Sequence, residues 1–526
     1  MKLLIKNGTL YDGSGKSGCK ASVLVDGEVI EGIYPQGEEL PVDIDRVIDA
    51  EGLLVTPGFI DSHAHSDAYL IVESSAPSKI TQGITTEING QCGGSAVPRY
   101  GEARLSSDWA AILGDRLSWR SFSEYREAFE KAAPTINSIQ FIGHNTLRSS
   151  IVGYVGRSAD ADELKRMVYL LEESLDSGGW GLSTGLIYQP GKYATLSEVE
   201  TLASAVAKRG GLYATHMRSE GDRILESISE VVALAEKTGI RAEISHLKTS
   251  GKKNWHKLDA VFEKIEDGIS RGLLLGSDRY PFSAAGTDLD VVLPDWAQEG
   301  AALSEMERFK DVKLRARIIG ELNDSPRDWH DVMIGGTWSK ENKRYSGRRV
   351  SEILEGTSPG EKIVEILERD GCKTSAFFFG MSEENMMRIL SKDWIVPGSD
   401  ASLRAPWGPL GVDHPHPRAY ATMPEFFRRV SSLSAASTSV DDSIAHTIAR
   451  MTRVPAQRFG IMRRGEIKKN YYADIAVWDK DSFVSKSTYD DPHQFAMGMK
   501  YVIVNGSVAF DNGVITSQGK GKLLTP

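Results

Sequence analysis

Two histidines separated by one residue, His63 and His65, stand at the end of an apolar stretch that is typical of a β-strand. Residues i and i+2 of a strand point to the same side, so both imidazoles could reach one metal ion at the end of the strand. A His-x-His pair by itself is also common in ordinary polar loops. The pair therefore raises a hypothesis of a metal centre, which the rest of the chain has to support.

Other candidate ligands follow further strand-like segments. Besides the two histidines, they are Cys92, His216, His246 and Asp400. Each has an ordinary alternative: a histidine at a strand end is usually a hydrogen-bonded polar residue, a lone cysteine a small buried residue, and a lone aspartate a helix cap. The six residues lie at the ends of five predicted strands, which favours one shared site. Imidazole and thiolate groups suit Zn²⁺, and three protein ligands with an open position are typical of a catalytic zinc.

The segment between Pro57 and Pro455 alternates short apolar strands with amphipathic helices, which is typical of parallel α/β proteins. The predicted strands end near His63, Asn89, Gly143, Thr184, His216, His246, Asp278 and Asp400. Eight β/α units predict a (β/α)₈ TIM-type barrel, in which active-site groups project from the C-terminal ends of the strands. The interval before the last strand is too long for one crossover, so it predicts an inserted subdomain, about residues 288–356, over the barrel mouth.

Both ends of the chain contain short strand-like segments separated by turn pairs such as Asn7-Gly8 and Asn505-Gly506. Neither set is large enough to be stable alone. We therefore expect residues 1–56 and 456–526 to form one composite β-sandwich domain beside a barrel of residues 57–455.

The composition is that of a soluble globular protein: 526 residues, 40% apolar and 25% charged. A net charge of −10 without a basic cluster argues against a nucleic-acid partner. No apolar run approaches the roughly 20 residues that span a membrane, and the first residues do not form a signal sequence. Three scattered cysteines do not suggest a disulfide framework. We expect a cytoplasmic protein without membrane partners, and its oligomeric state, including a homo-oligomer, stays open.

The run from Pro57 to His65, with Cys92, His216, His246 and the pair Ser399-Asp400, resembles the amidohydrolase superfamily. More narrowly, the chain is similar to the N-acyl-D-amino-acid deacylases, or D-aminoacylases. The narrower resemblance rests on residues 89–93 (NGQCG), 143–148 (GHNTLR), 215–218 (THMR), 245–248 (SHLK) and 414–418 (HPHPR). It extends over nearly the whole chain. Many amidohydrolases bridge two metals with a carboxylated lysine on strand four, whereas residues 180–184 (WGLST) offer no lysine.

The resemblance implies a zinc cofactor and a role for each candidate ligand. The ligands would be divided between a tight zinc site, with Cys92, His216 and His246, and a weaker second site, with His63 and His65. Asp400 would be the general acid/base, which accepts a proton from water and protonates the leaving amide nitrogen. The products would be a carboxylate and a free D-amino acid.

An N-acyl amino acid carries a free α-carboxylate, so its pocket needs cationic or hydroxyl donors. Lys248, two residues beyond His246, and Tyr280, two residues beyond Asp278, would lie above the barrel mouth. The resemblance implies a carboxylate clamp at these two positions, and it adds Tyr188 to the lining of the pocket. A lysine in a solvated loop is the alternative for Lys248.

Further candidate contacts have open assignments. Arg148 and Arg218 could contact the substrate, or equally could form structural salt bridges. The loop 401–413 is longer than in similar sequences, and Ala401 stands where they have glycine. In this loop Arg404 could pair with an acidic substrate side chain and Trp407 could cover an apolar one, with plain surface roles as the alternative. Side-chain and acyl-chain specificity is therefore not predicted.

The preferred hypothesis is a zinc-dependent deacylase of N-acyl-D-amino acids, in which the D preference comes wholly from the resemblance. Its alternatives are an amidohydrolase that opens cyclic amides, as hydantoinases and dihydroorotases do, an enzyme that cleaves dipeptides, and a non-catalytic metal-binding barrel. The missing lysine on strand four and the presence of Cys92 weigh against cyclic amides. The presence of Asp400 weighs against a non-catalytic barrel.

Overall fold

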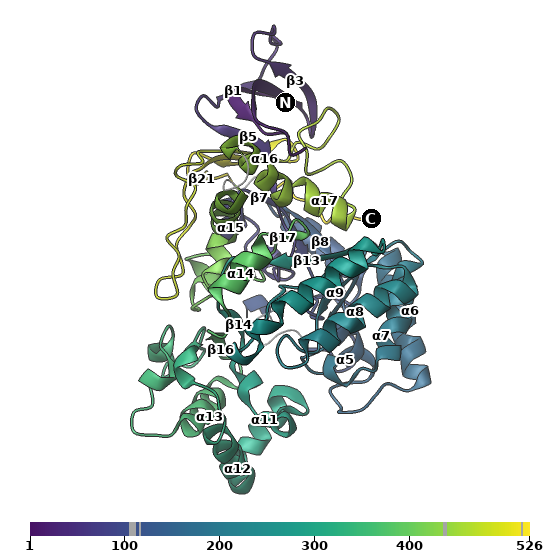
Figure 1. Cartoon of the computed structure of the whole chain (residues 1–526), viewed down its shortest axis with the longest axis vertical. Helices are drawn as coiled ribbons and strands as arrows, with labels where there is room; N and C mark the ends of the chain where they lie inside the picture. The colour runs from purple at the N-terminus through teal and green to yellow at the C-terminus, as the bar shows by residue number, and fades with distance from the viewer. Residues whose placement is uncertain (105–111, 115–116, 435–438, 517–518) are drawn as a thin grey trace.

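A ring of parallel strands forms the middle of the computed structural model, which describes residues 1–104, 112–114, 117–434, 439–516 and 519–526 (Figure 1). In ring order the strands are β6 (Phe59–Asp61), β7 (Ile84–Asn89), β8 (Asn137–Gln140), β9 (Ile142–Gly143), β10 (Gly181–Gly185), β11 (Leu212–His216), β12 (Arg241–Ile244), β13 (Leu275–Arg279) and β17 (Ile395–Pro397). Only Phe141 separates β8 from β9, so the two count as one strand. The Ser62 N–H donates to the Pro397 carbonyl (3.0 Å) and the Asp400 N–H to the His63 carbonyl (2.8 Å). These bonds close the strands into the predicted barrel.

Three strands end earlier than the sequence predicts. The strand β6 ends at Asp61, β12 at Ile244 and β17 at Pro397, whereas the expected ends were near His63, His246 and Asp400. His63 and His65 therefore follow their strand and do not lie on it. His246 and Asp400 have left-handed backbone angles, with φ of 38° and 49°. A strand does not accommodate a positive φ, so the extended backbone stops before each of them.

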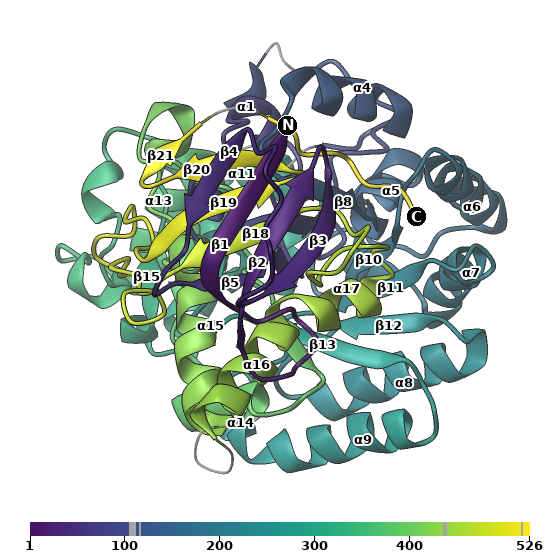
Figure 2. The same ribbon diagram turned by 90° about the horizontal axis from the view of Figure 1, so that it is seen from above.

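Amphipathic helices cover the outside of the barrel (Figures 1 and 2). They are α1 (Tyr69–Val72), α2 (Pro77–Ile80), α4 (Phe122–Ala132), α5 (His144–Ile151), α6 (Ala161–Asp176), α7 (Leu196–Ala207), α8 (Ile224–Thr238), α9 (Leu258–Ser270), α14 (Glu383–Leu390), α15 (Arg418–Ser434), α16 (Val440–Met451) and α17 (Arg453–Phe459). Helix α7 shows why the sequence forms them: the Thr195 side chain caps its first turn, and Val199, Leu202 and Val206 form its buried face. Among the described residues, no helix has the length and apolarity needed to cross a bilayer.

The two ends of the chain form one β-sheet at the top of Figure 1. Its strands, in order, are β21 (Val514–Ile515), β20 (Ser507–Asp511), β19 (Met499–Val504), β18 (Ile475–Trp478), β5 (Leu54–Pro57), β1 (Lys2–Leu10), β2 (Cys19–Asp26) and β3 (Val29–Pro35), with β4 (Arg46–Asp49) beside β1. The antiparallel pairing of β5 with β18 joins the N-terminal and C-terminal strands, which lie side by side in Figure 2. Side chains from both sets, including Ile5, Val23, Ile475 and Ile503, share one core. The strands belong to one hydrogen-bonded sheet because β5 pairs on both sides.

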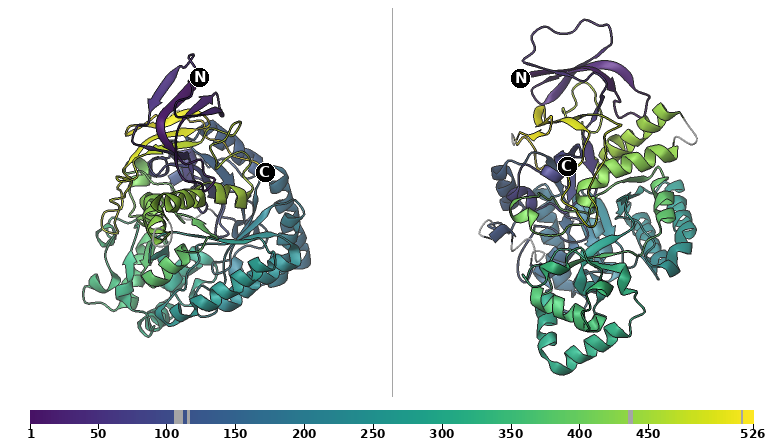
Figure 3. Two further views of the ribbon diagram at one scale, coloured as in Figure 1. Left: turned by 45° about the horizontal axis from the view of Figure 1, so that its top comes forward. Right: turned by 90° about the vertical axis from the view of Figure 1, so that its left-hand side faces the viewer.

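The inserted subdomain lies at the opposite end of the molecule from this sheet (Figures 1 and 3). It comprises β14 (Ala285–Asp288), α10 (Asp295–Gln298), α11 (Ala301–Lys310), α12 (Val312–Asn323), β15 (Val332–Ile334), α13 (Pro359–Asp370) and β16 (Ser375–Phe378). The subdomain continues past residue 356, the expected end. The reason is packing, because Ile363, Leu367 and Ala376 share a core with Leu289 and Phe309.

Candidate metal centre

Three of the predicted site residues have an unusual backbone conformation. Cys92, His246 and Asp400 have φ of 52°, 38° and 49°, although none of them is glycine. Such angles cost energy and persist only where the surrounding structure holds them, and they are frequent at functional sites. Each of the three residues follows the C-terminal end of a barrel strand by two or three positions.

Buried aspartates hold the backbone around each of these positions. Asp278 accepts a hydrogen bond from the His246 N–H (3.0 Å), and Asp61 accepts one from the Ser399 N–H (2.8 Å). Asp67 accepts from the N–H groups of residues 90 and 96, each at 3.2 Å, on the two sides of Cys92. Carboxylates are strong acceptors for backbone N–H groups. These buried carboxylates therefore stabilise the strained backbone at Cys92, His246 and Asp400.

All six predicted ligands lie together at this mouth. They form two sets in which the potential ligand atoms lie within 4.8 Å of one another: His63, His65, Cys92 and Asp400 in one, and Cys92, His216 and His246 in the other. The Cys92 sulfur is 3.3 Å from His63 Nε2 and 3.3 Å from His246 Nε2. Cys92 therefore belongs to both sets, whereas the resemblance implied only the tight site for it.

The donor chemistry of the second set fits zinc. It consists of one thiol and two imidazoles, the ligand types of many zinc sites. In the described part of the chain, neither ring nitrogen of the buried His216 has a hydrogen-bond partner, and the nearest carboxylate oxygen, Glu220 Oε2, lies 3.6 Å from Nε2. A buried polar group without a partner needs an explanation, and coordination of a metal supplies one. The structure therefore offers a site that suits zinc.

Charge in the cluster favours the ionised forms of Cys92 and Asp400. Burial alone would raise the pKa of the Cys92 thiol, but His63 and His246 lower it well below its usual value. Burial would also raise the pKa of Asp400, and the Arg418 guanidinium together with His246 holds it well below its usual range. A thiolate is the form that binds metals, and a carboxylate is the form that accepts a proton.

Acidic partners orient two of the imidazoles. His63 Nδ1 lies 3.0 Å from Asp278 Oδ2, and His246 Nδ1 lies 2.9 Å from Glu220 Oε1. In both rings the other nitrogen, Nε2, faces Cys92. A carboxylate on the outer nitrogen fixes the ring and increases the basicity of the nitrogen that binds a metal. Glu220 was not identified from the sequence, although it lies four residues after His216.

Three of the predicted substrate contacts lie beside the ligands. The Tyr188 and His216 ring centres are 4.8 Å apart. Lys248 Nζ lies 2.5 Å from Glu220 Oε1 and 6.0 Å from the centre of the Tyr280 ring. The Tyr280 hydroxyl is buried, and it has no hydrogen-bond partner among the described residues. All three side chains thus lie beside the ligand cluster, and the Lys248 ammonium, paired with Glu220, also lies 2.7 Å from His246 Nδ1.

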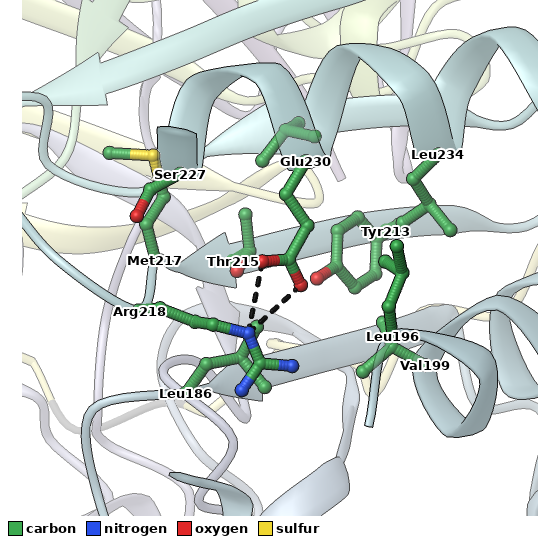
Figure 4. Close-up of a pocket in the computed structure, with 11 residues that line it drawn as sticks. Leu186, Leu196, Val199, Tyr213, Thr215, Met217, Arg218, Ser227, Glu230 and Leu234 are labelled. Carbon is green, nitrogen blue, oxygen red and sulfur yellow. Dashed lines mark hydrogen bonds and ion pairs between the residues drawn. The ribbon is translucent and has the colours of Figure 1, made fainter. Parts of the chain in front are cut away.

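Two predicted arginines are committed to salt bridges away from the ligands. Arg148 Nε lies 3.1 Å from Glu198 Oε1. Arg218 Nε lies 2.9 Å from Glu230 Oε2, and Figure 4 shows this pair beside a small pocket between the barrel and helix α8. The structure places both side chains in the structural role that the sequence left as the alternative.

The two candidate residues of the loop 401–413 also form contacts with protein side chains. Arg404 Nε lies 2.9 Å from Asp413 Oδ2, and the Trp407 indole N–H donates to Glu73 Oε2 (3.0 Å). The Trp407 side chain is otherwise largely exposed. The structure thus supports the surface-loop alternative for Trp407, whereas Arg404 is largely buried and pairs within its own loop.

The guanidinium of Arg418, which was not among the predicted site residues, faces Asp400. Arg418 Nη1 lies 2.8 Å from Asp400 Oδ2, and its guanidinium is 4.6 Å from the centre of the Tyr280 ring. The Arg418 N–H donates to Nδ1 of His416 (3.0 Å), which fixes the start of helix α15. The sequence did contain a sign of this residue, because Arg418 is the last residue of the HPHPR motif. No local pattern, however, predicts the direction of its side chain.

A parallel barrel with clustered thiol, imidazole and carboxylate groups at the C-terminal ends of its strands defines a metal-dependent hydrolase. Residues 46–281 match the model of the amidohydrolase family. The chain is 30% identical to the N-acyl-D-glutamate deacylase of Alcaligenes xylosoxydans xylosoxydans, over 97% of this chain and 94% of that protein. It is also 30% identical to the D-aminoacylase of the same organism, over 99% and 97%. The chain belongs to the amidohydrolase family.

Solved structures agree with this assignment. A D-aminoacylase with a binuclear metal centre has a TM-score of 0.82 and 29% identity, over 100% of this chain and 99% of that one. The N-acyl-D-glutamate deacylase of Bordetella bronchiseptica, in complex with zinc and a phosphonate that mimics the tetrahedral intermediate, has a TM-score of 0.83 and 28% identity, again over 100% and 99%. The likeness includes the composite β-sheet and the inserted subdomain, because it covers the whole chain.

Proposed function

We propose that the protein is a zinc-dependent deacylase that hydrolyses the amide bond of N-acyl-D-amino acids to a carboxylate and a free D-amino acid. One observation carries the proposal: the carboxylate of Asp400 lies between the cluster of potential zinc ligands and the guanidinium of Arg418. A group that can transfer a proton, a potential zinc site and a cation that could bind the substrate's carboxylate thus lie next to one another. The relatives named above act on this class of substrate.

The proposed tight zinc site consists of Cys92, His216 and His246. A second, weaker site would use His63 and His65, and the geometry adds Cys92 to it as a shared ligand. A bound zinc supplies Lewis acidity, which polarises the scissile carbonyl and lowers the pKa of a water molecule. The ligand imidazoles are held for this task by Asp278 and Glu220.

Asp400 is the proposed general acid/base. Its low pKa keeps it ionised, so it accepts a proton from the attacking water and then gives that proton to the amide nitrogen. Without this proton the nitrogen would leave as an unstable anion. His65 Nε2 lies 3.0 Å from Asp400 Oδ1, while Arg418 faces the other oxygen, so both oxygens of the carboxylate are oriented.

Lys248, Tyr280 and Arg418 are proposed to bind the α-carboxylate of the substrate. Two cations and a buried hydroxyl without a partner surround one place, and charge-assisted hydrogen bonds to a carboxylate are strong. Tyr188, beside His216, would line the pocket near the acyl group. A carboxylate bound here would lie near Asp400, because Arg418 contacts both places.

The alternative of a cyclic-amide hydrolase has less support. Strand β10 has the sequence GLSTG and contributes no lysine that could be carboxylated. The thiol of Cys92 takes the shared position between the two ligand sets instead. The D preference follows from the relatives, since no single contact in the site distinguishes the two enantiomers.

An assay of amine release tests the function. The purified zinc enzyme is given N-acetyl-D- and N-acetyl-L-amino acids with acidic, apolar and aromatic side chains, with hydantoin and a dipeptide as controls. We expect release from D substrates only. Equal rates on both enantiomers would remove the D-specific claim, and faster turnover of hydantoin would replace the deacylase with a cyclic-amide hydrolase.

We also propose a cytoplasmic location. All three cysteines are free, and the proposed ligand Cys92 has to stay reduced to bind zinc. Fractionation of cells that produce the protein at natural levels tests this proposal, with activity expected in the cytoplasmic fraction.

A further inference from the structure

A lysine ammonium is completely buried beneath the segment that carries Asp400. Lys79, on the short helix α2, has an exposed fraction of 0%. Its Nζ lies 2.7 Å from Glu87 Oε1, 3.0 Å from Asp61 Oδ2, 3.1 Å from Ser399 Oγ and 3.1 Å from the Ala401 carbonyl. One cation therefore joins strands β6 and β7 to the two residues that flank Asp400.

The contacts of Lys79 fall on both sides of a strained residue. Asp400 has a φ of 49°, a conformation that persists only when its surroundings enforce it. On one side, the Ser399 hydroxyl donates to Asp61 Oδ2 (2.6 Å) and lies beside the ammonium. On the other side, the carbonyl of Ala401 accepts from Lys79. Charge-assisted hydrogen bonds are stronger than neutral ones, so this ammonium fixes the turn firmly.

The network also keeps Lys79 charged. A buried ammonium is costly unless carboxylates and further acceptors satisfy it. Burial alone would lower the pKa of Lys79, but Asp61 and Glu87 hold it above its usual value. Glu87 also accepts from the hydroxyl of Ser66 (3.2 Å), the residue after His65. The cation therefore has partners that serve no evident purpose in substrate binding.

We propose that Lys79 is a positioning residue for Asp400, an inference that rests on the proposed function. It holds the carboxylate at the distance and direction needed for proton transfer to the amide nitrogen, and it touches neither the substrate nor the tight zinc ligands. None of its four contacts is to Cys92, His216 or His246. The loss of Lys79 should therefore slow the chemical step and leave tight zinc and substrate binding in place.

The test compares Lys79→Met with Arg464→Met, both as zinc-loaded full-length enzymes. Arg464 is a matched control, because it also forms a buried ion pair, with Asp474, but holds the terminal sheet. Measurements are the zinc content, KM and kcat on an N-acetyl-D-amino acid that the wild type hydrolyses. We expect Lys79→Met to lose about 100-fold in kcat, the size of effect that a small misplacement of a catalytic group produces. Its zinc content and KM should stay near those of the wild type, and Lys79→Arg, which keeps the charge, should recover part of the loss.

The activity of the wild type distinguishes a failure of the proposed function from a failure of the positioning role. If the wild type hydrolyses no N-acyl-D-amino acid, the proposed function is wrong. If the wild type is active and Lys79→Met loses no more kcat than Arg464→Met, or loses zinc and kcat together, the positioning role is wrong. If Lys79→Met does not fold, Ser399→Ala serves as the test, because it removes one of the contacts of Lys79. We expect this variant to lose about 10-fold in kcat at unchanged KM. A kcat equal to that of the wild type would overturn the proposal.

Discussion

The sulfur of Cys92 lies 3.3 Å from Nε2 of His63, a ligand of the proposed weaker metal site. The same sulfur lies 3.3 Å from Nε2 of His246, a ligand of the proposed tight site. One thiolate is thus shared by two ligand sets. The sharing means that the two metal sites should not be independent: a change at Cys92 should disturb both, while a change at His65 should disturb one.

Replacement of Cys92 should remove the tightly bound zinc. In Cys92→Ala we expect almost no zinc to remain after dialysis against a weak chelator, because two neutral imidazoles alone bind zinc much less tightly than a set with a thiolate. Metal analysis by mass spectrometry measures the result. Cys19→Ala is the matched control, since this cysteine is exposed and free. Retention of one zinc per chain in Cys92→Ala would show that the ligand assignment is wrong.

Asp400→Asn should separate metal binding from catalysis. The amide keeps the shape of the side chain but accepts no proton, so kcat should fall by at least about 100-fold, the usual contribution of a general acid/base. The tight zinc should remain, because its proposed ligands are unchanged. Steady-state kinetics together with metal analysis check both parts. A variant with near wild-type activity would require a different proton-transfer group.

Arg418→Met should weaken recognition of the substrate's carboxylate. We expect kcat/KM on an N-acyl-D-amino acid to fall by about 10- to 100-fold, which corresponds to the loss of a charged hydrogen bond. The corresponding α-amide, which has no carboxylate, should be hydrolysed slowly by the wild type. Because Arg418 also contacts Asp400, the variant should lose some activity on this amide, but less than on the free acid.

Arg218→Met is the comparison for this prediction, because its guanidinium is committed to Glu230. It should leave the preference for the free acid unchanged. If Arg418→Met still discriminates between the acid and the amide as the wild type does, Arg418 does not bind the carboxylate.

The inserted subdomain should become less stable as the pH rises. Burial raises the pKa of Glu305 from 4.5 to about 7. The folded subdomain therefore keeps a proton that the unfolded chain releases, so stability is highest below about pH 4.5 and falls as the pH rises towards 7. Burial also raises the pKa of the neighbouring Asp290, to about 8, so this carboxyl contributes in the same direction. Between pH 5 and pH 8 we expect the wild type to lose more stability than Glu305→Gln, whose side chain does not titrate.

Chemical denaturation at the two pH values measures this difference. Glu307→Gln on the same helix α11 is the control, since Glu307 is exposed and paired with Lys310. It should show the same pH dependence as the wild type. A loss of stability in Glu305→Gln as large as that of the wild type would assign the effect to another group.

The predicted ligands could be found from the sequence because their positions depend on local patterns. His216 is the last residue of β11, and the run of residues that precedes it is recognisable as a buried strand. The salt-bridge partners of the arginines could not be predicted in this way. Arg148 pairs with Glu198, which is 50 residues away in the chain, and only the packing of α5 against the start of α7 brings the two together. The end of the insertion was missed for the same reason, since helix α13 joins its core from a distance.

The sequence by itself determined which chemical groups stand at the ends of the barrel strands, because residue type and strand periodicity are local properties. The tertiary structure decided how these groups are shared and charged: that Cys92 belongs to two ligand sets, that Arg418 and not Arg148 faces the site, and that Lys79 lies beneath Asp400. These relationships depend on distant segments that pack against one another. Burial then determines which charges are neutralised and which remain available for a substrate.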